Sequence, residues 1–333
     1  MKLLLSLILI IAACNTTEKR QTASQEVSRS PWFFETTTYN IRNPLFDDVE
    51  LRTGYYVEST PLKGCILYLE GLADSVANQA PLFNHLSKNG YRVIFFDYMG
   101  QGASGGSMNN TRIVDSANES LQISTQAKYI WSKYVDKKDE LNGQDCSHSK
   151  KFVMGWSTGG LAAYTLVHEG WADAVAMITP GIHVKAFVGE SATDKSLMLT
   201  FKQTISERTL TRNTFSGTFD PHIEPIKPIS PAVIPLFAAN LMISSKLSQK
   251  WKVPAAIPGI AFLSGTNDTY VDREAISKTL KKNAPHFEQV KYDGALHELQ
   301  NEMPEVSSDL YARTVRFFDG LTAGSPAAPG MAL

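Results

Sequence analysis

The sequence lacks features that would place it in several common classes of protein. Its 32 lysines and arginines balance 33 aspartates and glutamates, and neither sign forms a long run. A surface built to attract the phosphates of nucleic acid is therefore not expected. No internal repeat is visible in the 333 residues. A chain of this length can form one large α/β domain with an insertion, or two smaller domains.

Motifs for metal ions and nucleotides are also missing. His297 begins a phrase in which Asn301 stands where the zinc motif H-E-x-x-H requires a second histidine. The acidic residues within 268–274 lack the glycine and the spacing of a calcium loop. The glycine-rich residues 100–106 lack the Gly-Lys-Ser/Thr of a phosphate-binding loop. We expect neither a metal ion nor a cofactor.

Cysteine is scarce, and the first of the three cysteines follows an apolar N-terminus. Lys2 precedes an apolar run over residues 3–13, which has the length of a signal peptide and is too short to span a bilayer. Two alanines then precede Cys14, a pattern similar to the lipobox of bacterial lipoproteins, in which the cysteine is lipidated. We expect residues 1–13 to be a signal peptide and the polar residues 14–30 to tether an exported protein to a membrane of the bacterial cell envelope, facing the periplasm. The alternative is an ordinary cleaved signal peptide with an incidental cysteine.

The two remaining cysteines, Cys65 and Cys146, each lie near an expected core strand. The corresponding ends of the sheet could be neighbours, and export to an oxidising compartment would allow a disulfide between them. A disulfide and two separate buried thiols are equally consistent with the sequence.

From residue 32 onward, strand-like and helix-like segments alternate, which is typical of a sheet with helices packed on its faces. Strands are expected at residues 33–39, 49–56, 65–69, 91–96, 152–154, 172–178, 260–263 and 287–292, and helices at residues 79–88, 117–135, 161–168, 273–282 and 308–318. The regular alternation in the centre of the chain predicts parallel strands. The fold class is therefore α/β, with a mostly parallel central sheet flanked by helices.

The alternation is interrupted once. We expect residues 184–253 to form an inserted cap on a core made of residues 31–183 and 254–323, with a disordered tail at residues 324–333. The second half of the cap is rich in apolar residues, among them Val233, Leu236, Phe237, Leu241 and Met242. We expect most of these side chains to bury the cap against the core and a few to line a pocket for an acyl chain.

A nucleophile is indicated by the pattern G-x-S-x-G at residues 155–159. The pattern lies between an apolar strand and a helix-like stretch, so Ser157 would stand at the tip of a sharp turn where a base can reach its hydroxyl. The flanking glycines would allow the tight turn. Such a pentapeptide arises by chance in about one chain in ten of this length, so the assignment depends on partners for the serine.

Partners for Ser157 are expected where other parallel strands end. His297 follows the last expected strand and is preferred as the general base among seven histidines, with His183 as the second choice. Asp268 follows the strand before it and is preferred as the acid that orients the histidine. Asp272 lies one turn further on, where it can cap the next helix. The order serine, aspartate, histidine along the chain is the one expected of an α/β-hydrolase.

Two backbone N–H groups are needed to bind the negative oxygen that forms when a serine attacks a carbonyl. Thr158 comes directly after the nucleophile at the start of a helix, where free amides point outward. Leu72, in the loop after the strand at residues 65–69, is expected to supply the second N–H. Gly71 beside it would let the chain approach closely.

Four stretches of the chain resemble a known family, the serine hydrolases of the α/β-hydrolase fold that include monoacylglycerol lipases and bacterial lysophospholipases. They are residues 70–75, residues 97–105, the turn at Ser157 and residues 294–302. The last is similar to the family's terminal histidine phrase over nearly its whole length, and the resemblance runs from about residue 52 to residue 321. In that family the first aspartate of a phrase like residues 267–272 belongs to the catalytic triad, which supports Asp268.

The resemblance implies an α/β-hydrolase fold with an inserted cap, and a serine esterase that cleaves a single-acyl lipid through an acyl-enzyme on Ser157. The expected substrate is a small lipid ester, either a lysophospholipid or a monoacylglycerol, and the lipid on Cys14 would hold the enzyme at a membrane. Glu70 stands where many members have histidine and Met99 where many have arginine, which weakens the substrate preference that the family implies. The alternatives are a peptidase of the same fold and a lipoprotein that only binds.

Overall fold

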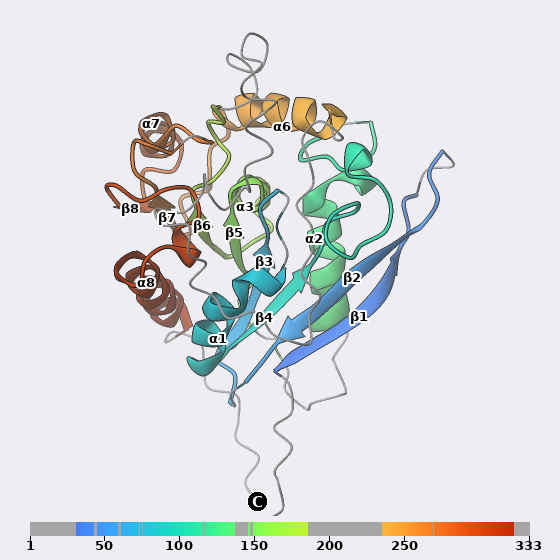
Figure 1. The fold of residues 1–333 in the computed structure, drawn as a ribbon, viewed down its shortest axis with the longest axis horizontal. Coiled ribbons are helices and arrows are strands. Elements are labelled where there is room, and N and C mark those ends of the chain that lie inside the picture. Colours follow the sequence, from blue (N-terminus) through green and yellow to red (C-terminus); the bar gives the residue numbers. More distant parts are fainter. Residues whose placement is uncertain are drawn as a thin grey trace, which may run out of the picture. The chain divides into compact units, whose positions relative to one another are not determined.

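The computed structural model describes residues 31–42, 45–58, 61–72, 74, 76–115, 117–136, 146, 149–185, 235–268 and 270–322. These residues contain an eight-stranded sheet with helices packed on both faces (Figure 1). The expected signal peptide, Cys14, the tether, most of the cap and the tail lie outside the described residues, so those expectations stay predictions.

In chain order, the strands are β1 (Trp32–Tyr39), β2 (Val49–Tyr56), β3 (Gly64–Leu69), β4 (Tyr91–Phe96), β5 (Phe152–Trp156), β6 (Ala174–Ile178), β7 (Gly259–Leu263) and β8 (Glu288–Lys291). They lie in the order β1-β2-β4-β3-β5-β6-β7-β8. The pairs β1–β2 and β2–β4 are antiparallel, and every other neighbouring pair is parallel. The mostly parallel sheet that the sequence predicted is therefore confirmed.

The helices among the described residues are α1 (Ala80–Lys88), α2 (Ile123–Trp131), α3 (Thr158–His168), α6 (Pro235–Ser248), α7 (Arg273–Asn283) and α8 (Pro304–Thr322). Side chains of α1 and α8 belong to one hydrophobic cluster, and side chains of α2, α3 and α7 belong to another. Along β3, Leu67 joins the second cluster and Tyr68 the first, as the two-residue period of a strand requires. The sheet is thus covered on both faces, which explains its continuous apolar strands.

The helix expected at residues 117–135 begins later than predicted. The chain first forms a 3-10 turn, Glu119–Leu121, and then an extended residue, Gln122, with φ −76° and ψ 138°. The N–H of Ile123 donates to Arg112 O over 2.8 Å, and α2 begins there. Apolar residues keep helical spacing across the break, so periodicity alone could not locate the start of the helix.

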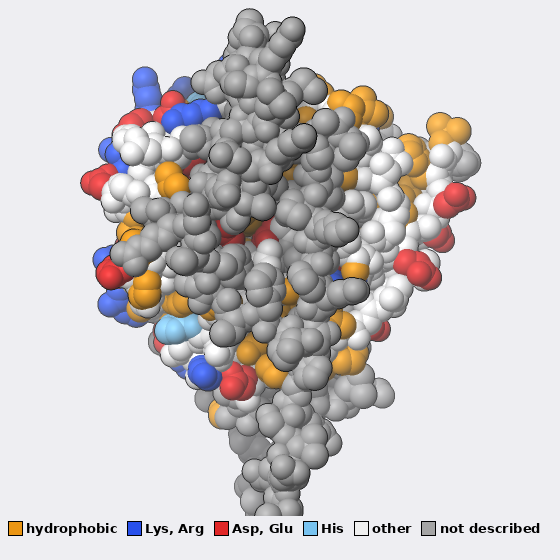
Figure 2. Space-filling model, in the orientation of Figure 1, with side chains coloured by type: hydrophobic (Ala, Val, Ile, Leu, Met, Phe, Trp, Pro, Cys, Tyr) orange, Lys and Arg blue, Asp and Glu red, His pale blue; other side chains and the backbone are white. Residues whose placement is uncertain are grey.

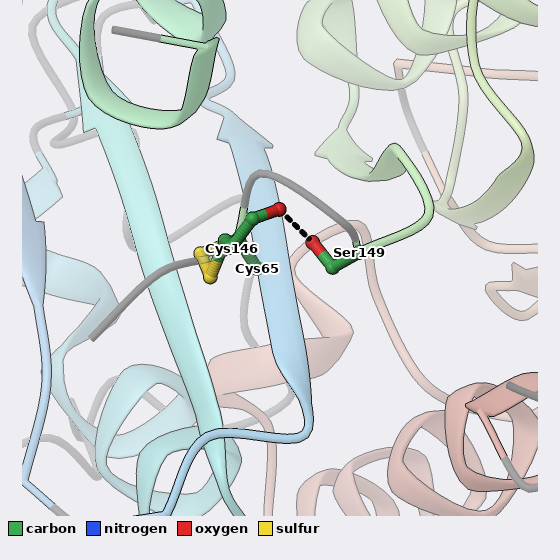
Figure 3. The surroundings of a disulfide bond; sticks show 3 residues. All are labelled: Cys65, Cys146 and Ser149. Atoms are coloured by element: carbon green, nitrogen blue, oxygen red, sulfur yellow. Dashed lines mark hydrogen bonds between the residues drawn. A yellow bond between two sulfur atoms is a disulfide. The ribbon is translucent and has the colours of Figure 1, made fainter. Parts of the chain in front are cut away.

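A disulfide joins Cys65, the second residue of β3, to Cys146 in the segment before β5 (Figure 3). Both cysteines are buried. The hydroxyl and the N–H of Ser149 each donate to Cys146 O over 2.8 Å, which fixes the segment beside the disulfide. Of the two outcomes that the sequence allowed, the structure has the disulfide. It ties together the amino-terminal ends of two paired strands, β3 and β5.

Helix α6 is the part of the predicted cap that the structure describes at length. Phe237 and Leu241 are buried in the hydrophobic cluster that also contains α3 side chains, as expected for most apolar residues of the cap. Leu236, Ile243 and Leu247 are 58%, 59% and 42% exposed on the other side of the helix. Figure 2 shows hydrophobic side chains at the surface above α6.

Candidate active site

A strained turn holds the predicted nucleophile. β5 ends at Trp156 and α3 begins at Thr158, so Ser157 alone makes the turn, with φ 54° and ψ −114°. A positive φ costs a residue with a side chain roughly 1–3 kcal/mol and is retained where the surroundings enforce it. A Cβ on Gly159 would lie 2.0 Å from Leu69 O, and a Cβ on Gly155 would lie 2.3 Å from Gly159 O. Only glycine fits at either end, which is the structural reason for the G-x-S-x-G pattern.

The three side chains predicted to form a triad lie in one hydrogen-bonded chain. His297 Nε2 is 2.8 Å from Ser157 Oγ, and His297 Nδ1 is 2.8 Å from Asp268 Oδ2. Ser157 follows β5, Asp268 follows β7 and His297 follows β8, and these strands belong to the parallel part of the sheet. Their carboxyl-terminal ends therefore meet at one edge, as argued from the sequence.

The environment of Asp268 favours its charged form. Its carboxylate accepts hydrogen bonds from Ser264 Oγ at 2.5 Å and from the N–H groups of Tyr270 and Val271 at 2.7 and 3.1 Å, besides the bond to His297. Burial alone would raise the pKa of Asp268, but the neighbouring His297 and these hydrogen bonds lower the pKa to about 2. The ionised carboxylate holds a proton on His297 Nδ1, which leaves Nε2 free to act as a base.

Hydrogen bonds to the backbone of His297 also help to position its imidazole. His297 O accepts hydrogen bonds from Trp156 Nε1 at 3.0 Å and from Thr179 Oγ1 at 2.8 Å. The ring of Tyr270 lies 5.0 Å from the imidazole, centroid to centroid. The sequence motifs did not indicate these positioning residues, although Thr179 follows β6 directly and so stands at a strand end like the residues of the triad.

The rival candidates have other roles. His183 Nε2 lies 2.7 Å from Thr279 Oγ1, on α7, so the second choice for the base is not the partner of Ser157. The side chain of Asp272 accepts a hydrogen bond from the N–H of Ala275 at 3.0 Å and caps α7. That is the role expected for Asp272 when Asp268 was preferred as the acid.

The loop after β3 lies against the turn that holds the serine. A Cβ on Gly71 would come within 2.4 Å of the Trp156 ring, so the loop passes directly over the end of β5. Thr158 is the first residue of α3, and its N–H has no acceptor within the helix. This arrangement suits the two donors predicted for the oxyanion, the N–H groups of Thr158 and Leu72.

Buried carboxyl groups lie behind the same loop. Glu70 and Asp97 are fully buried, and Asp74 is 6% exposed. Asp97 Oδ2 lies 2.7 Å from Arg52 Nη2, and Asp74 accepts a hydrogen bond from Gln79 Nε2 at 2.7 Å. Burial, followed by the nearby Asp97 and Asp74, raises the pKa of Glu70 well above its usual value. From the sequence, Glu70 stood out as part of the resemblance at residues 70–75 and as a difference from the family's usual histidine, and not as a buried acid.

A parallel sheet with a nucleophile turn after β5, an acid after β7 and a histidine after β8 decides the architecture. The chain has the α/β-hydrolase fold. Similar solved structures include a soluble variant of monoglyceride lipase from Saccharomyces cerevisiae, at 16% identity and a TM-score of 0.62, covering 86% of this chain and 95% of that one. A monoacylglycerol lipase from Paleococcus ferrophilus is 17% identical with a TM-score of 0.55, covering 83% of this chain and 100% of its own. A carboxyl esterase from Bacillus coagulans is 14% identical with a TM-score of 0.57, covering 87% and 99%.

Comparison of the sequence with family models covers a smaller part of the chain. A family model described as serine aminopeptidase, S33, matches residues 60–219. The match includes Leu72, Ser157 and Thr158 and ends before Asp268 and His297, so the structure supplies the link between the two halves of the triad. No curated protein matches the chain significantly.

Two kinds of feature are absent from the residues that the structure describes. No group of three or more histidine, cysteine, aspartate or glutamate side chains there is arranged to hold a metal ion. None of the helices in that part of the chain combines the length and the apolar character needed to cross a membrane.

Proposed function

We propose that the protein is a serine esterase that hydrolyses carboxylic esters through a covalent acyl-enzyme on Ser157. The observation that carries the proposal is the unbroken hydrogen-bond chain from Asp268 through His297 to Ser157. A serine hydroxyl is a weak nucleophile until a correctly oriented base takes its proton. The three residues meet that requirement, and the adjacent helix start supplies an N–H for the developing negative charge.

The proposed reaction has two halves. Ser157 Oγ attacks the ester carbonyl while His297 Nε2 takes the serine proton, and the N–H groups of Thr158 and Leu72 bind the oxyanion. His297 then gives the proton to the leaving alcohol, which frees the alcohol and leaves the acyl group on Ser157. In the second half, water gives a proton to His297 and attacks the acyl-enzyme, and His297 then returns the proton to Ser157 Oγ as the carboxylic acid leaves. Asp268 stays ionised and stabilises the imidazolium in both halves.

We infer that the substrate is a single-acyl lipid ester, either a lysophospholipid or a monoacylglycerol. Two of the similar structures are named monoglyceride and monoacylglycerol lipases, and apolar side chains of α6 reach the surface. The second candidate function is a peptidase of the same fold, which is favoured by the description of the matching family as serine aminopeptidase. Purified protein that released amino acids from peptides faster than fatty acid from glycerol esters would favour the peptidase.

The location proposed from the sequence is the bacterial cell envelope, with Cys14 carrying the lipid anchor. The buried disulfide between Cys65 and Cys146 supports export, since disulfides persist in oxidising compartments. Mass spectrometry of the N-terminal peptide tests the anchor. We expect a diacylglyceryl-modified cysteine that is lost in Cys14→Ser, and an unmodified peptide from the wild type would disprove the anchor.

Replacing the nucleophile tests the catalytic proposal. We expect Ser157→Ala to lower kcat for monoacylglycerol and short acyl esters at least about 10⁴-fold, because the hydroxyl that forms the acyl-enzyme is gone. The control is Ser277→Ala, which removes a hydroxyl on α7 that is hydrogen-bonded to Gln289 on β8. Hydrolysis that survives Ser157→Ala would contradict the serine mechanism.

A further inference from the structure

The loop that carries Leu72 is held from behind by the segment after β4. Gln101 Nε2 donates one hydrogen bond to Glu70 Oε1 at 2.7 Å and another to Gly71 O at 2.8 Å. Tyr98 Oη donates to Glu70 O at 2.5 Å. The carbonyl groups of Glu70 and Gly71 therefore both point toward residues 98–101.

These contacts fix the direction of the N–H groups in the loop. The C=O and N–H of a trans peptide point in opposite directions. Because Gly71 O is bonded to Gln101, the N–H of Leu72 in the same peptide points away from Gln101. If the peptide flipped, a carbonyl oxygen would replace the N–H and would repel an oxyanion. Glycine has the fewest steric barriers to such a flip, so the bond to Gly71 O matters.

The side chain of Glu70 is placed for a neutral carboxyl group. It is fully buried, and its Oε2 has no hydrogen-bond partner in the part of the chain that the structure describes. An ionised carboxylate with one bare oxygen is strongly unfavourable away from water. As a neutral acid, Glu70 still offers Oε1 as an acceptor to Gln101.

The charges around Glu70 lead to the same conclusion. The titratable groups that face it come from several elements, and they are Arg52, Tyr68, Asp74, Asp97 and Tyr98. Arg52 forms an ion pair with Asp97, with Nη2 2.7 Å from Oδ2, and influences Glu70 less than Asp97 and Asp74 do. Two nearby carboxyl groups remain as repulsive neighbours for a charge on Glu70.

We propose that Gln101, anchored by a neutral Glu70, is a positioning residue that keeps the N–H of Leu72 directed at the oxyanion. The inference rests on the proposed function, since an oxyanion forms only if Ser157 attacks a carbonyl. Neutrality has a chemical purpose here, because a negative charge on Glu70 would lie behind the donors and oppose the charge that they must stabilise.

Two variants test the positioning role. Gln101→Leu keeps the size of the side chain and removes both donated hydrogen bonds; we expect kcat per active site to fall about 10- to 100-fold, with KM changed less than threefold. Glu70→Gln keeps an acceptor for Gln101 and cannot ionise; we expect kcat to stay within fivefold of the wild type. The matched control is Gln249→Leu, which removes a bond from a glutamine to the backbone O of Ile182.

The readouts separate positioning from simple stability. Active sites are counted by complete reaction with a fluorophosphonate, so unfolded enzyme does not lower the measured kcat. A trifluoromethyl ketone forms a tetrahedral adduct on a serine, and its inhibition constant should rise in Gln101→Leu by the same factor by which kcat/KM falls. A merely structural role would lower the melting temperature and leave both quantities unchanged.

The possible failures are distinguishable. If the wild type does not hydrolyse esters, or if Ser157→Ala still does, the proposed function fails. If the wild type depends on Ser157 but Gln101→Leu keeps kcat per active site within fivefold, only the positioning role is overturned. A loss of more than fivefold in Glu70→Gln would show that the charged carboxylate is required, and would overturn the neutral assignment.

Discussion

Two buried carboxyl groups follow strands at the same edge of the sheet, yet their surroundings favour opposite charge states. Asp268, after β7, is 2% exposed, and Glu70, after β3, is fully buried. Asp268 accepts hydrogen bonds from a hydroxyl, two N–H groups and an imidazole, and its pKa is lowered to about 2. Glu70 accepts one side-chain bond from Gln101 and lies among other carboxyl groups, and burial raises its pKa.

The difference shows that burial disfavours the charged form of both carboxyl groups, and that the hydrogen-bonding and charged neighbours of each group decide whether it is ionised. Donors and a neighbouring imidazole compensate the charge of Asp268, so the group stays ionised. Among the residues that the structure describes, the Glu70 carboxyl has a single donor, Gln101, and it avoids the cost of a buried charge by holding its proton. Each state suits its place, because the charge on Asp268 orients His297 and stabilises its protonated form, whereas a charge on Glu70 would oppose the oxyanion.

The largest expected effect is on the charged member of the pair. Asp268→Asn replaces the acceptor beside His297 Nδ1 with a group that can present N–H donors, which favours the tautomer with its proton on Nε2. We expect kcat to fall about 10⁴-fold, against less than fivefold for the equally isosteric Glu70→Gln. Steady-state hydrolysis of a monoacylglycerol at pH 7 measures both. Similar losses in the two variants would erase the distinction between the carboxyl groups.

The charged site was the more predictable of the two. Ser157, Asp268 and His297 each follow a strand within a short recognisable phrase, and parallel strands bring their ends together whatever the details of packing. Glu70 and Gln101 lie 31 positions apart in two loops, and no periodicity relates such residues. Their contact depends on how the segment after β4 folds back on the loop after β3, which only the three-dimensional structure reveals.

The fold was predictable where every residue of a strand is buried. It was less predictable where local hydrogen bonds interrupt a helical pattern of apolar residues. The runs of β4 and β5, apolar apart from Arg92, indicate central strands directly. A β-bridge between Gln122 and Arg112 interrupts a helical pattern, so the start of α2 was misplaced. The sequence could not decide whether Cys65 and Cys146 form a disulfide, because the distance between two cysteines depends on the order of the strands in the sheet.

The next effect concerns the stability conferred by a neutral Glu70. Its folded pKa lies above its usual value near 4.5, so the folded state binds more protons than the unfolded state at higher pH, and stability falls as pH rises through that window. Glu70→Gln lacks this loss. We expect the unfolding free energy of the variant to gain on the wild type as pH rises above 4.5, with a slope of at most about 1.4 kcal/mol per pH unit.

Urea denaturation at pH 5, 6 and 7 with the disulfide intact measures this difference. The control is Glu305→Gln at an exposed position of α8, which measures the effect of replacing a glutamate that is not buried. A gap between Glu70→Gln and the wild type that did not widen with pH would mean that Glu70 is ionised in the folded protein. The contrast with Asp268 would then be wrong.

The smallest expected effect tests why Asp268 stays charged. Its folded pKa of about 2 lies below its usual value of 3.8, so its ionisation contributes stability above pH 4 that is lost as pH falls toward 2. Ser264→Ala removes one of the donors, and a hydrogen bond to a charged group is worth about 1.5 kcal/mol. We expect the variant to lose about that much unfolding free energy at pH 7 and less at pH 3, where protonation of Asp268 begins to remove the charge that the hydroxyl stabilises.

The control is Ser277→Ala, which breaks a hydrogen bond between neutral groups and should show the same loss at both values of pH. If the loss in Ser264→Ala is also independent of pH, the hydroxyl does not respond to the charge, and the remaining donors, the N–H groups of Tyr270 and Val271 with the imidazole, are enough to keep Asp268 ionised.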